Sequence, residues 1–405
     1  MKMAELLLIG IDGGATEVKS HHIVVQKKES KITFSLGKAT SSRRYKFVDN
    51  FTPVPIQTQL SERNNNNVTL TPMEIAQADN YIQATYETVA DIVKETGIKD
   101  VLIGMGMPGL KTIDGRGINM IIHGARLPNF LDLLEDKISK EGIKLINPIY
   151  KLGSDADYCG IGEEYADEGL FKDIENGYYL GGGTGVADAM KLKGELVTFD
   201  AAKSWIQKSW QIISSLGITY EKGISAKSIN TFYANILKCS QEELIERSKF
   251  PEIEVKKGDL YASSVMTIAS QLLAELLFER IYTIKNGREE LGYRGEAYLN
   301  LEKNHPFKGT LLDRIIIGQR VGRIFGDKQF ENVLRKPAEN ILVKMIQDFG
   351  DDNMKNHYLS KGKIKTGIIM SSNLRAAPAI GAAIDAFRYY KLKTEDTDKI
   401  KLSNK

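Results

Sequence analysis

The strongest constraint on the fold is a pattern near the start of each half of the chain: an apolar strand, a glycine-rich turn and a second strand. In the N-terminal half, the apolar run Leu6–Ile11 leads into Asp12-Gly13-Gly14-Ala15-Thr16. Later, Tyr178–Leu180 leads into Gly181-Gly182-Gly183-Thr184-Gly185, and the apolar segment Val186–Leu192 follows. The repetition predicts a coarse internal duplication of one strand-turn-strand unit, although such hairpins are common enough to recur by coincidence.

Length and composition bound the kind of protein. A chain of 405 residues with 42% hydrophobic and 26% charged residues is globular, and its length favours two domains. We expect an N-terminal domain at 1–153, a larger domain at 154–380, and a C-terminal helix at 381–405 that packs back on the first domain. The 55 basic and 52 acidic residues nearly cancel, so the charge balance gives no indication of a nucleic-acid partner.

The cysteines and the apolar segments bear on the compartment. Cys159 and Cys239 lie far apart and show no metal-ligand spacing, which favours a reducing compartment and argues against structural zinc. The longest apolar stretch, Val265–Ile281, contains charged side chains that a membrane span would avoid: Glu275, Glu279 and Arg280. A cytoplasmic protein without a membrane partner is therefore expected.

The remaining pattern predicts an α/β protein. Strand-forming residues at 22–26, 31–36 and 44–48 indicate an antiparallel meander after the first glycine turn. From about residue 201 the chain has mainly helical character, which includes a strongly apolar helix at 263–285.

A capped helix is predicted between the meander and the next strand. Thr71 suits the N-cap, Pro72 the first helical position, and Glu74 completes a capping box. Gly97 suits the end of this helix.

Both glycine turns have the chemistry of a phosphate site. Glycine lets backbone N–H groups approach a phosphate, Thr16 adds a hydroxyl, and Asp12 could hold Mg²⁺ through water. The second turn lacks the Gly-Lys-Ser/Thr of a Walker A loop, and it leads into a strand rather than the helix of a Rossmann fingerprint. Either turn alone would fit an ordinary hairpin equally well.

A carboxylate pair precedes a predicted helix in Ser154-Asp155-Ala156-Asp157. One carboxylate beside a transferred phosphoryl group could accept the proton of an attacking hydroxyl. Helix capping by Ser154 or Asp155 is the alternative explanation, and both roles can hold together.

The ordered set of these motifs resembles the ROK family of sugar kinases and regulators, within the actin/hexokinase/Hsp70 ATPase superfamily. The residues that carry the resemblance are the turn at 12–16, Gly104–Gly109, Leu127–Phe130, Ser154–Glu163, the loop at 181–185 and Gly381–Ala383. The resemblance implies an α/β fold with two ribonuclease-H-like domains around a central nucleotide cleft. It also implies an ATP- and Mg-dependent kinase that phosphorylates a hydroxyl of a sugar or sugar-like small molecule.

The resemblance also implies roles for individual residues. Asp155 is then the catalytic base, and Asp12 serves the metal. The residues expected to bind the nucleotide are Asp12, Gly13, Gly14, Ala15, Thr16, Gly182, Gly183, Thr184, Gly185 and Gly318. The residues expected to bind the acceptor are Pro108, Gly109, Arg126, Ser154, Asp155 and Glu163. For Arg126, a solvated arginine is the favoured interpretation, and a guanidinium that faces an anionic group of the substrate is the alternative.

The chain departs from the family pattern mainly on the sugar side. Where family members carry a Gly-Glu-x-Gly-His segment and a zinc-binding cysteine cluster, this chain has Thr198–Trp205. Arg126 and Ser154 each stand where the family has Asn, and Gln319 stands where it has a second Gly. The phosphate machinery is therefore kept better than the sugar-recognition set, which puts glucose in doubt as the acceptor and leaves the identity of the sugar open.

A non-kinase role is the alternative: an ATP-binding activator or a sugar-sensing regulator. A regulator would need a DNA-binding helix-turn-helix before the first glycine turn, and few residues precede Leu6. An activator of a redox enzyme would be expected to offer cysteines for an iron–sulfur cluster. The expected partner is a small sugar-like molecule, and a homodimer stays open.

Overall fold

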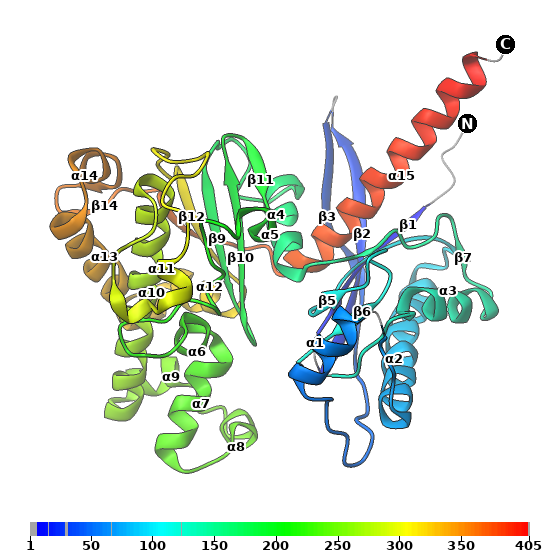
Figure 1. The fold of residues 1–405 in the computed structure, drawn as a ribbon, viewed down its shortest axis with the longest axis horizontal. Helices are drawn as coiled ribbons and strands as arrows, with labels where there is room; N and C mark the ends of the chain where they lie inside the picture. Colours follow the sequence, from blue (N-terminus) through cyan, green and yellow to red (C-terminus); the bar gives the residue numbers. More distant parts are fainter. Residues whose placement is uncertain (1–5, 15, 29–30, 66, 123, 404–405) are drawn as a thin grey trace. The chain divides into compact units, whose positions relative to one another are not determined.

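The computed structural model describes residues 6–14, 16–28, 31–65, 67–122 and 124–403. The chain packs into two compact units, which are described separately: unit 1 comprises residues 1–169 and 376–405, and unit 2 comprises residues 170–375 (Figure 1). The boundaries expected from the sequence stand before α4 (Asp155–Tyr165) and within α15 (Ala377–Ser403). The contact-defined boundaries instead follow α4 and precede α15, because these two helices pack against each other.

Unit 1 is built on a mixed sheet with the strand order β3-β2-β1-β4-β7, in which β8 also pairs with β4. The strands are β1 (Leu7–Gly13), β2 (Glu17–Lys28), β3 (Lys31–Arg44), β4 (Asp100–Gly106), β7 (Lys144–Leu145) and β8 (Leu152–Gly153). The first three form the antiparallel meander that the sequence predicts, and β4 runs parallel to β1. The prediction of separate strands at 31–36 and 44–48 is wrong, since β3 continues unbroken to Arg44 and ends there.

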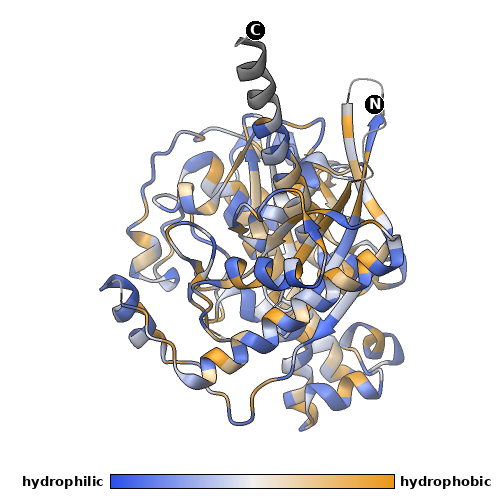
Figure 2. Ribbon diagram, turned by 90° about the vertical axis from the view of Figure 1, so that its right-hand side faces the viewer, coloured by the Kyte–Doolittle hydropathy of each residue, from blue (hydrophilic) through white to orange (hydrophobic). Residues whose placement is uncertain are grey.

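The two faces of this sheet bury different side chains. Along β1, Ile9 and Ile11 join the hydrophobic core shared with α2 (Pro72–Thr96) and α3 (Phe130–Lys140). The alternate residue Gly10 faces α15, and Gly104 of β4 does the same, because strand side chains alternate between faces. A Cβ at either glycine would collide with a carbonyl oxygen of α15, so the helix can lie directly on the sheet. Figure 2 shows hydrophobic and hydrophilic residues mixed along both the strands and the helices.

Helix α2 begins and ends as predicted. The Thr71 hydroxyl accepts a hydrogen bond from the Glu74 backbone, the Glu74 carboxylate accepts one from the Thr71 backbone, and Pro72 occupies the first turn. Gly97 closes the helix in the left-handed conformation. Unit 1 also contains α1 (Ile56–Asn64), β5 (Leu110–Lys111) and β6 (Ile118–Met120).

Unit 2 repeats the sheet topology of unit 1, with the strand order β11-β10-β9-β12-β15. Its strands are β9 (Gly177–Gly182), β10 (Val186–Leu192), β11 (Glu195–Val197), β12 (Arg314–Gly318) and β15 (Ile369–Ser371). Strands β9, β10 and β11 are antiparallel, and β12 and β15 run parallel to β9. The predicted internal duplication is confirmed at the level of the sheets.

The core of unit 2 centres on α10 (Leu260–Asn286). Among the described residues it is the helix long and apolar enough to cross a membrane, yet 61% of its apolar window is buried inside unit 2, as in the core helix of a soluble protein. The other helices of unit 2 are α5 (Phe199–Ala202), α6 (Tyr220–Ile224), α7 (Ala226–Leu237), α8 (Gln241–Glu246), α9 (Pro251–Glu254), α11 (Glu296–Leu299), α12 (Gln319–Gly326), α13 (Lys336–Phe349) and α14 (Asp352–Tyr358). Residues 203–219 are irregular, contrary to the mainly helical character predicted from residue 201.

A buried ionic network lies behind the β9–β10 hairpin. Asp188 of β10 accepts hydrogen bonds from the Tyr178 hydroxyl at 2.5 Å, the Ser209 backbone at 2.8 Å and the Arg280 guanidinium at 3.2 Å. Arg280 also donates to Glu279 at 2.8 Å. Burial disfavours the charge of Arg280, but Glu279, Tyr178 and Asp188 raise its pKa, so the guanidinium stays charged inside unit 2.

Candidate active site

The carboxyl ends of three strands meet at one edge of the unit 1 sheet. Asp12 of β1 lies in register with Gly106 of β4, and Gly106 lies in register with Gly153 of β8. Strand β8 leads directly into α4, whose first residue is Asp155. The sheet register therefore brings Asp12 and Asp155 to the same edge, as their proposed roles require.

The two carboxylates interact. Partial burial, followed by the negative charge of Asp155, raises the pKa of Asp12 from its ordinary value of 3.8 to about 6, although Lys19 opposes the shift. The repulsion between two carboxylates at one strand edge would be relieved by a bound cation.

The turn that follows β1 accepts only small residues. The Gly14 N–H donates to the Glu17 carbonyl at 2.9 Å and closes the turn. A Cβ at Gly13 would lie 2.5 Å from the Tyr81 hydroxyl and 2.9 Å from the Gly106 carbonyl oxygen, so this position requires glycine. Thr16 is exposed to solvent. Ala15, which was expected to bind the nucleotide, lies outside the described residues.

Helix α4 begins with a polar cap. The Ser154 hydroxyl accepts a long hydrogen bond, 3.5 Å, from the Asp157 backbone, and Ser154 is therefore the N-cap. Asp155 is half-buried in the first turn, where the helix dipole favours a negative charge. Glu163, on the same helix, is fully buried in unit 1, so its carboxylate is not open to a solute in this structure.

The segment after β4 continues the same edge. The Met107 N–H donates to the Gly153 carbonyl at 3.1 Å and ties this segment to β8. Pro108 is half-buried, and Gly109 has a φ of 98°, a left-handed conformation that favours glycine. Both residues are thus placed two or three positions beyond the end of β4 at Gly106.

Arg126 occupies a different environment from the one expected. Its side chain is 1% exposed, and it donates twice to the Glu74 carboxylate, at 2.7 Å each, as well as to Glu62 and, at 2.9 Å, to the Thr69 carbonyl. The hydrogen bonds that Arg126 donates to the Glu74 carboxylate raise the pKa of its guanidinium. The guanidinium therefore links α1 and α2 to the segment before Leu127. It is buried, so it cannot bind an anionic group of a substrate as expected.

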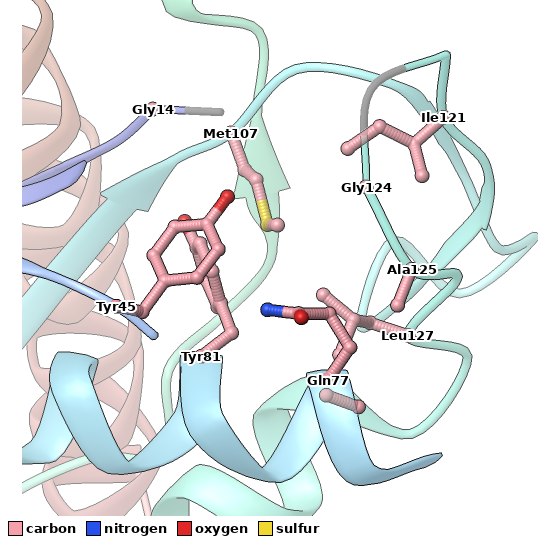
Figure 3. Close-up of a pocket in the computed structure, with 10 residues that line it drawn as sticks. Gly14, Tyr45, Gln77, Tyr81, Met107, Ile121, Gly124, Ala125 and Leu127 are labelled. Carbon is pink, nitrogen blue, oxygen red and sulfur yellow. The ribbon is translucent and has the colours of Figure 1, made fainter. Parts of the chain in front are cut away.

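A pocket lies next to this edge within unit 1 (Figure 3). Six of the residues that line it are Gly14, Tyr45, Gln77, Tyr81, Met107 and Leu127. Gly14 belongs to the glycine turn and Met107 follows the end of β4, so the pocket adjoins the Asp12–Asp155 edge. The sequence does not single out Gln77 and Tyr81, because such side chains on an amphipathic helix have the same pattern as core residues, or Tyr45, which follows the end of β3.

The glycine hairpin of unit 2 is shaped by its neighbours. The Gly183 N–H donates to the Gly185 carbonyl at 2.9 Å, and the Gly183 carbonyl accepts from the Lys227 N–H at 3.2 Å in the first turn of α7. Thr184 is exposed at its tip. Glu221 accepts from the Val186 N–H at 3.0 Å and stabilises the far side of the hairpin. An exposed glycine tip beside a helix N-terminus is a favourable environment for an anion.

A second helix begins beside the same hairpin. Gly318 is in register with Gly181 and caps α12, and Gly182 forms a bridge with Gln319. Gln319 has a φ of 56°, an uncommon conformation for a residue other than glycine, and its amide lies against Gly183. The structure thus brings Gly182, Gly183 and Gly318 together, as expected.

The residues present fit a magnesium nucleotide. A Cβ at the turn glycines would collide with neighbouring protein atoms, so the turns keep the bare backbone that can approach a phosphate, and Asp12 and Asp155 supply oxygen donors of the kind Mg²⁺ prefers. No group of three or more His, Cys, Asp or Glu side chains able to hold a metal occurs in the described part of the chain. This donor set suits an ion that binds through one or two carboxylates and retains its water.

Comparisons with known proteins give structural matches only. No protein-family model and no curated protein matches the sequence. A ROK family glucokinase from Streptomyces griseus, solved with glucose and AMPPNP, matches with a TM-score of 0.54 at 14% identity, over 94% of this chain and 99% of that one. The ROK hexokinase from Thermus thermophilus matches with a TM-score of 0.52 at 13% identity, over 95% and 99%.

A third match is a ROK family transcriptional regulator, a homologue of the E. coli MLC protein. It has a TM-score of 0.52 and 10% identity, over 95% of this chain and 79% of that one. At sequence identities this low, the comparisons establish the fold alone. The chain therefore has the mixed α/β, two-domain, actin-like ATPase fold of the ROK sugar kinases.

Proposed function

We propose that this protein is an ATP-dependent kinase that phosphorylates a hydroxyl of a sugar or sugar-like small molecule in the cytoplasm. The observation that carries the proposal is the meeting of Asp12 and Asp155 at one strand edge, next to a glycine turn, in a fold shared with sugar kinases. The neighbours supply a precedent for the substrates, since the Streptomyces glucokinase was solved with glucose and a nucleotide analogue.

In this proposal, the glycine turns bind the nucleotide phosphates. In unit 1, Gly13, Gly14 and Thr16 offer backbone and hydroxyl donors, and Asp12 would hold the magnesium ion that accompanies the nucleotide. In unit 2, Gly182, Gly183, Thr184 and Gly185 offer the tip of the hairpin, and Gly318 is part of the nucleotide site. Magnesium bound with ATP neutralises charge on the phosphates during transfer.

Asp155 is proposed as the general base. It accepts the proton of the acceptor hydroxyl while the phosphoryl group moves to the hydroxyl oxygen. Its place at the start of α4, fixed by the Ser154 cap and by the β8 strand before it, orients the carboxylate without cost at the moment of reaction. Pro108 and Gly109 are proposed to border the acceptor. Arg126 is left out of the proposed acceptor site because its guanidinium is committed to Glu74 and Glu62.

The test is a phosphorylation screen. Purified protein is incubated with ATP-Mg and a panel of sugars, amino sugars, sugar acids and cyclitols, and products are identified by mass spectrometry. An acceptor-dependent phosphate ester formed by the wild type, and abolished in Asp155→Asn, is the expected result. ATP that is bound but never transferred to any acceptor would contradict the proposal.

A sugar-sensing or ATP-binding role without transfer is the second candidate. It is favoured by the match to a ROK family transcriptional regulator, which has the same fold. The same screen separates the two, because a sensor would bind a sugar in calorimetry and yield no phosphorylated product.

A further inference from the structure

Two glycines lie next to each other where strands β4 and β8 end in unit 1. Gly106 and Gly153 are in register, and Gly106 is also in register with Asp12 of β1. A Cβ at Gly106 would lie 2.9 Å from the ring of Tyr158, and a Cβ at Gly153 would lie 2.0 Å from the same ring. One aromatic side chain therefore fills the space that both strand ends leave open.

Tyr158 belongs to the start of α4, three residues after Asp155. Its side chain is buried, and residues three apart lie on the same face of a helix, so Asp155 lies beside the ring. A Cβ at Gly106 would be 3.7 Å from the Asp155 Cα, which shows how closely the helix start approaches the end of β4. The contact between the ring and the two glycines therefore sets how α4 begins relative to the strand edge.

The other end of the Tyr158 side chain is held by α15. Its hydroxyl donates to the Asp385 carboxylate at 3.2 Å, and the Lys151 ammonium group lies 3.6 Å from the same carboxylate. Burial and the negative charge of Asp385 raise the pKa of Tyr158, so the hydroxyl keeps its proton and is the donor. A Cβ at Gly381 would lie 1.9 Å from the Tyr158 carbonyl oxygen, so α15 also packs directly on the backbone of α4.

We propose that Tyr158 is a positioning residue for the phosphoryl transfer. Its ring, which rests on two strand ends and is anchored to Asp385, sets the place of the Asp155 carboxylate relative to Asp12. The catalytic importance of this placement rests on the proposed function, whereas the placement itself is a property of unit 1. Tyr158 touches neither the nucleotide nor the acceptor in this proposal, and it acts through Asp155.

The first test is kinetic and uses Tyr158→Leu, which removes the ring from the two strand ends and leaves Asp155 and the Ser154 cap unchanged. With the acceptor found in the screen, kcat should fall by about 10- to 100-fold, because misplacing a reacting group by about 1 Å can cost this much. The KM values for ATP and for the acceptor should stay near those of the wild type, since the groups proposed to bind them are retained.

A double-variant cycle then asks whether Tyr158 acts through Asp155. In the Asp155→Asn background, which already lacks the proposed base, Tyr158→Leu should lower the residual kcat by no more than about 2-fold, because the two changes are coupled. A merely structural role would lower kcat by the same factor in both backgrounds. Tyr158→Phe is the milder second variant: it keeps the ring and loses the bond to Asp385, so its kcat should lie between those of the wild type and Tyr158→Leu.

The second test measures the placement without catalysis. Crystal structures of the full-length wild type and of Tyr158→Leu, both without nucleotide, should show the Asp155 carboxylate displaced by about 1 Å or more relative to Asp12 in the variant. Leu134→Ala in α3 is the control, because Leu134 is fully buried in the core of the same unit and its truncation costs stability. This control should lower the unfolding temperature, yet leave kcat and the place of Asp155 unchanged.

The outcomes separate this inference from the proposed function. An Asp155 carboxylate that keeps its place in Tyr158→Leu, or an equal loss of kcat in both backgrounds, would overturn the inference. A displaced carboxylate, in a protein whose wild type phosphorylates no acceptor, would support the positioning role and overturn the kinase. Phosphoryl transfer that requires Asp155 but is as fast in Tyr158→Leu as in the wild type would do the reverse.

Discussion

The two units have the same sheet topology but carry different side chains at the glycine-turn edge of the sheet. In both, a strand enters a glycine turn, returns antiparallel and has a parallel neighbour on its other side. In unit 1, Asp12 is the last residue but one of that strand, and it interacts with Asp155 at the start of α4. In unit 2 the positions in register are Gly181 and Gly318, which carry no side-chain chemistry. Each unit therefore has a glycine turn whose backbone N–H groups can bind phosphate. Acidic side chains are added at the strand edge of unit 1, where the chemistry is proposed.

The interiors behind the two turns differ as well. In unit 2, the β9–β10 hairpin contains Asp188, which forms a buried ion-pair network with Arg280 and Glu279. In unit 1, Tyr81 packs against Gly13 of the turn, and its hydroxyl has no hydrogen-bond partner among the described residues. Buried polar atoms without a partner occur in both described units, Arg280 Nε among them, so the contrast is between paired buried charges behind the unit 2 hairpin and an uncharged aromatic wall behind the unit 1 turn. The predictions below test that division.

The largest expected effect comes from breaking the network in unit 2. Arg280→Met leaves Asp188 and Glu279 buried without their cation, which should lower the free energy of unfolding by about 3–5 kcal/mol. Both tryptophans of the chain, Trp205 and Trp210, lie in unit 2, so tryptophan fluorescence in urea reads this unit. Arg335→Met is the control, because its pair with Glu339 is 41% exposed on the arginine side and should cost about 1 kcal/mol or less. Equal losses in both variants would show that the network is not the stabilising feature.

The next effect concerns the close approach of α15 to the sheet of unit 1. Gly104→Ala places a methyl group on the Ala382 carbonyl oxygen, a backbone atom that cannot turn away. We expect a loss of about 3 kcal/mol, at the upper end for overpacking. Hydrogen exchange of the β1 and β4 amides should accelerate, while Gly292→Ala, where nothing lies within 4 Å, should leave it unchanged. Protection of β1 and β4 that survives Gly104→Ala would contradict this account of the packing.

A smaller effect is expected at the tip of the unit 2 hairpin. Gly183→Val puts a branched side chain where phosphate oxygens are proposed to meet the backbone, and its Cβ would meet the side-chain amide of Gln319. We expect nucleotide affinity to fall by about 10-fold or more, equivalent to about 1.4 kcal/mol, with the fluorescence midpoint nearly unchanged. Gly292→Val, measured alongside by calorimetry with ATP-Mg, should bind normally. Wild-type affinity in Gly183→Val would remove the hairpin from the nucleotide site.

The smallest effect is a change in titration at the edge of unit 1. Burial and Asp155 hold the pKa of Asp12 at about 6, so in the folded protein Asp12 keeps its proton as the pH rises from 3.8 toward 6. Because the folded pKa is raised, the contribution of Asp12 to stability is fully present below that window and is lost as the pH rises through it. Asp155→Asn removes one negative charge and should lower the pKa of Asp12 partway, since burial remains. A ¹³C NMR titration of the Asp12 carboxyl without magnesium measures this change in pKa. An unchanged pKa in Asp155→Asn would show that Asp12 and Asp155 do not interact.

The sequence predicts the strands and the turns well, because they depend on local pattern. The capping box of α2 and the strand Val186–Leu192 both lie where expected. The role of Arg126 could not be predicted, because its partners Glu62 and Glu74 are 64 and 52 residues away along the chain. The pocket could not be predicted for the same reason. Tyr45 and Tyr81, which line it, come together only when α2 packs against β3.

The most direct test of the central claim is the turnover of Asp155→Asn beside that of Asp157→Asn. Both changes replace a carboxylate by an amide in the first turn of α4, so both should preserve the fold and ATP binding. With the acceptor found in the screen, Asp155→Asn should lose about 10²–10⁴ in the rate of phosphoryl transfer, as expected for removal of a general base, and Asp157→Asn should lose far less. Near-wild-type transfer by Asp155→Asn, with product confirmed by mass spectrometry, would contradict the assignment of Asp155 and the mechanism built on it.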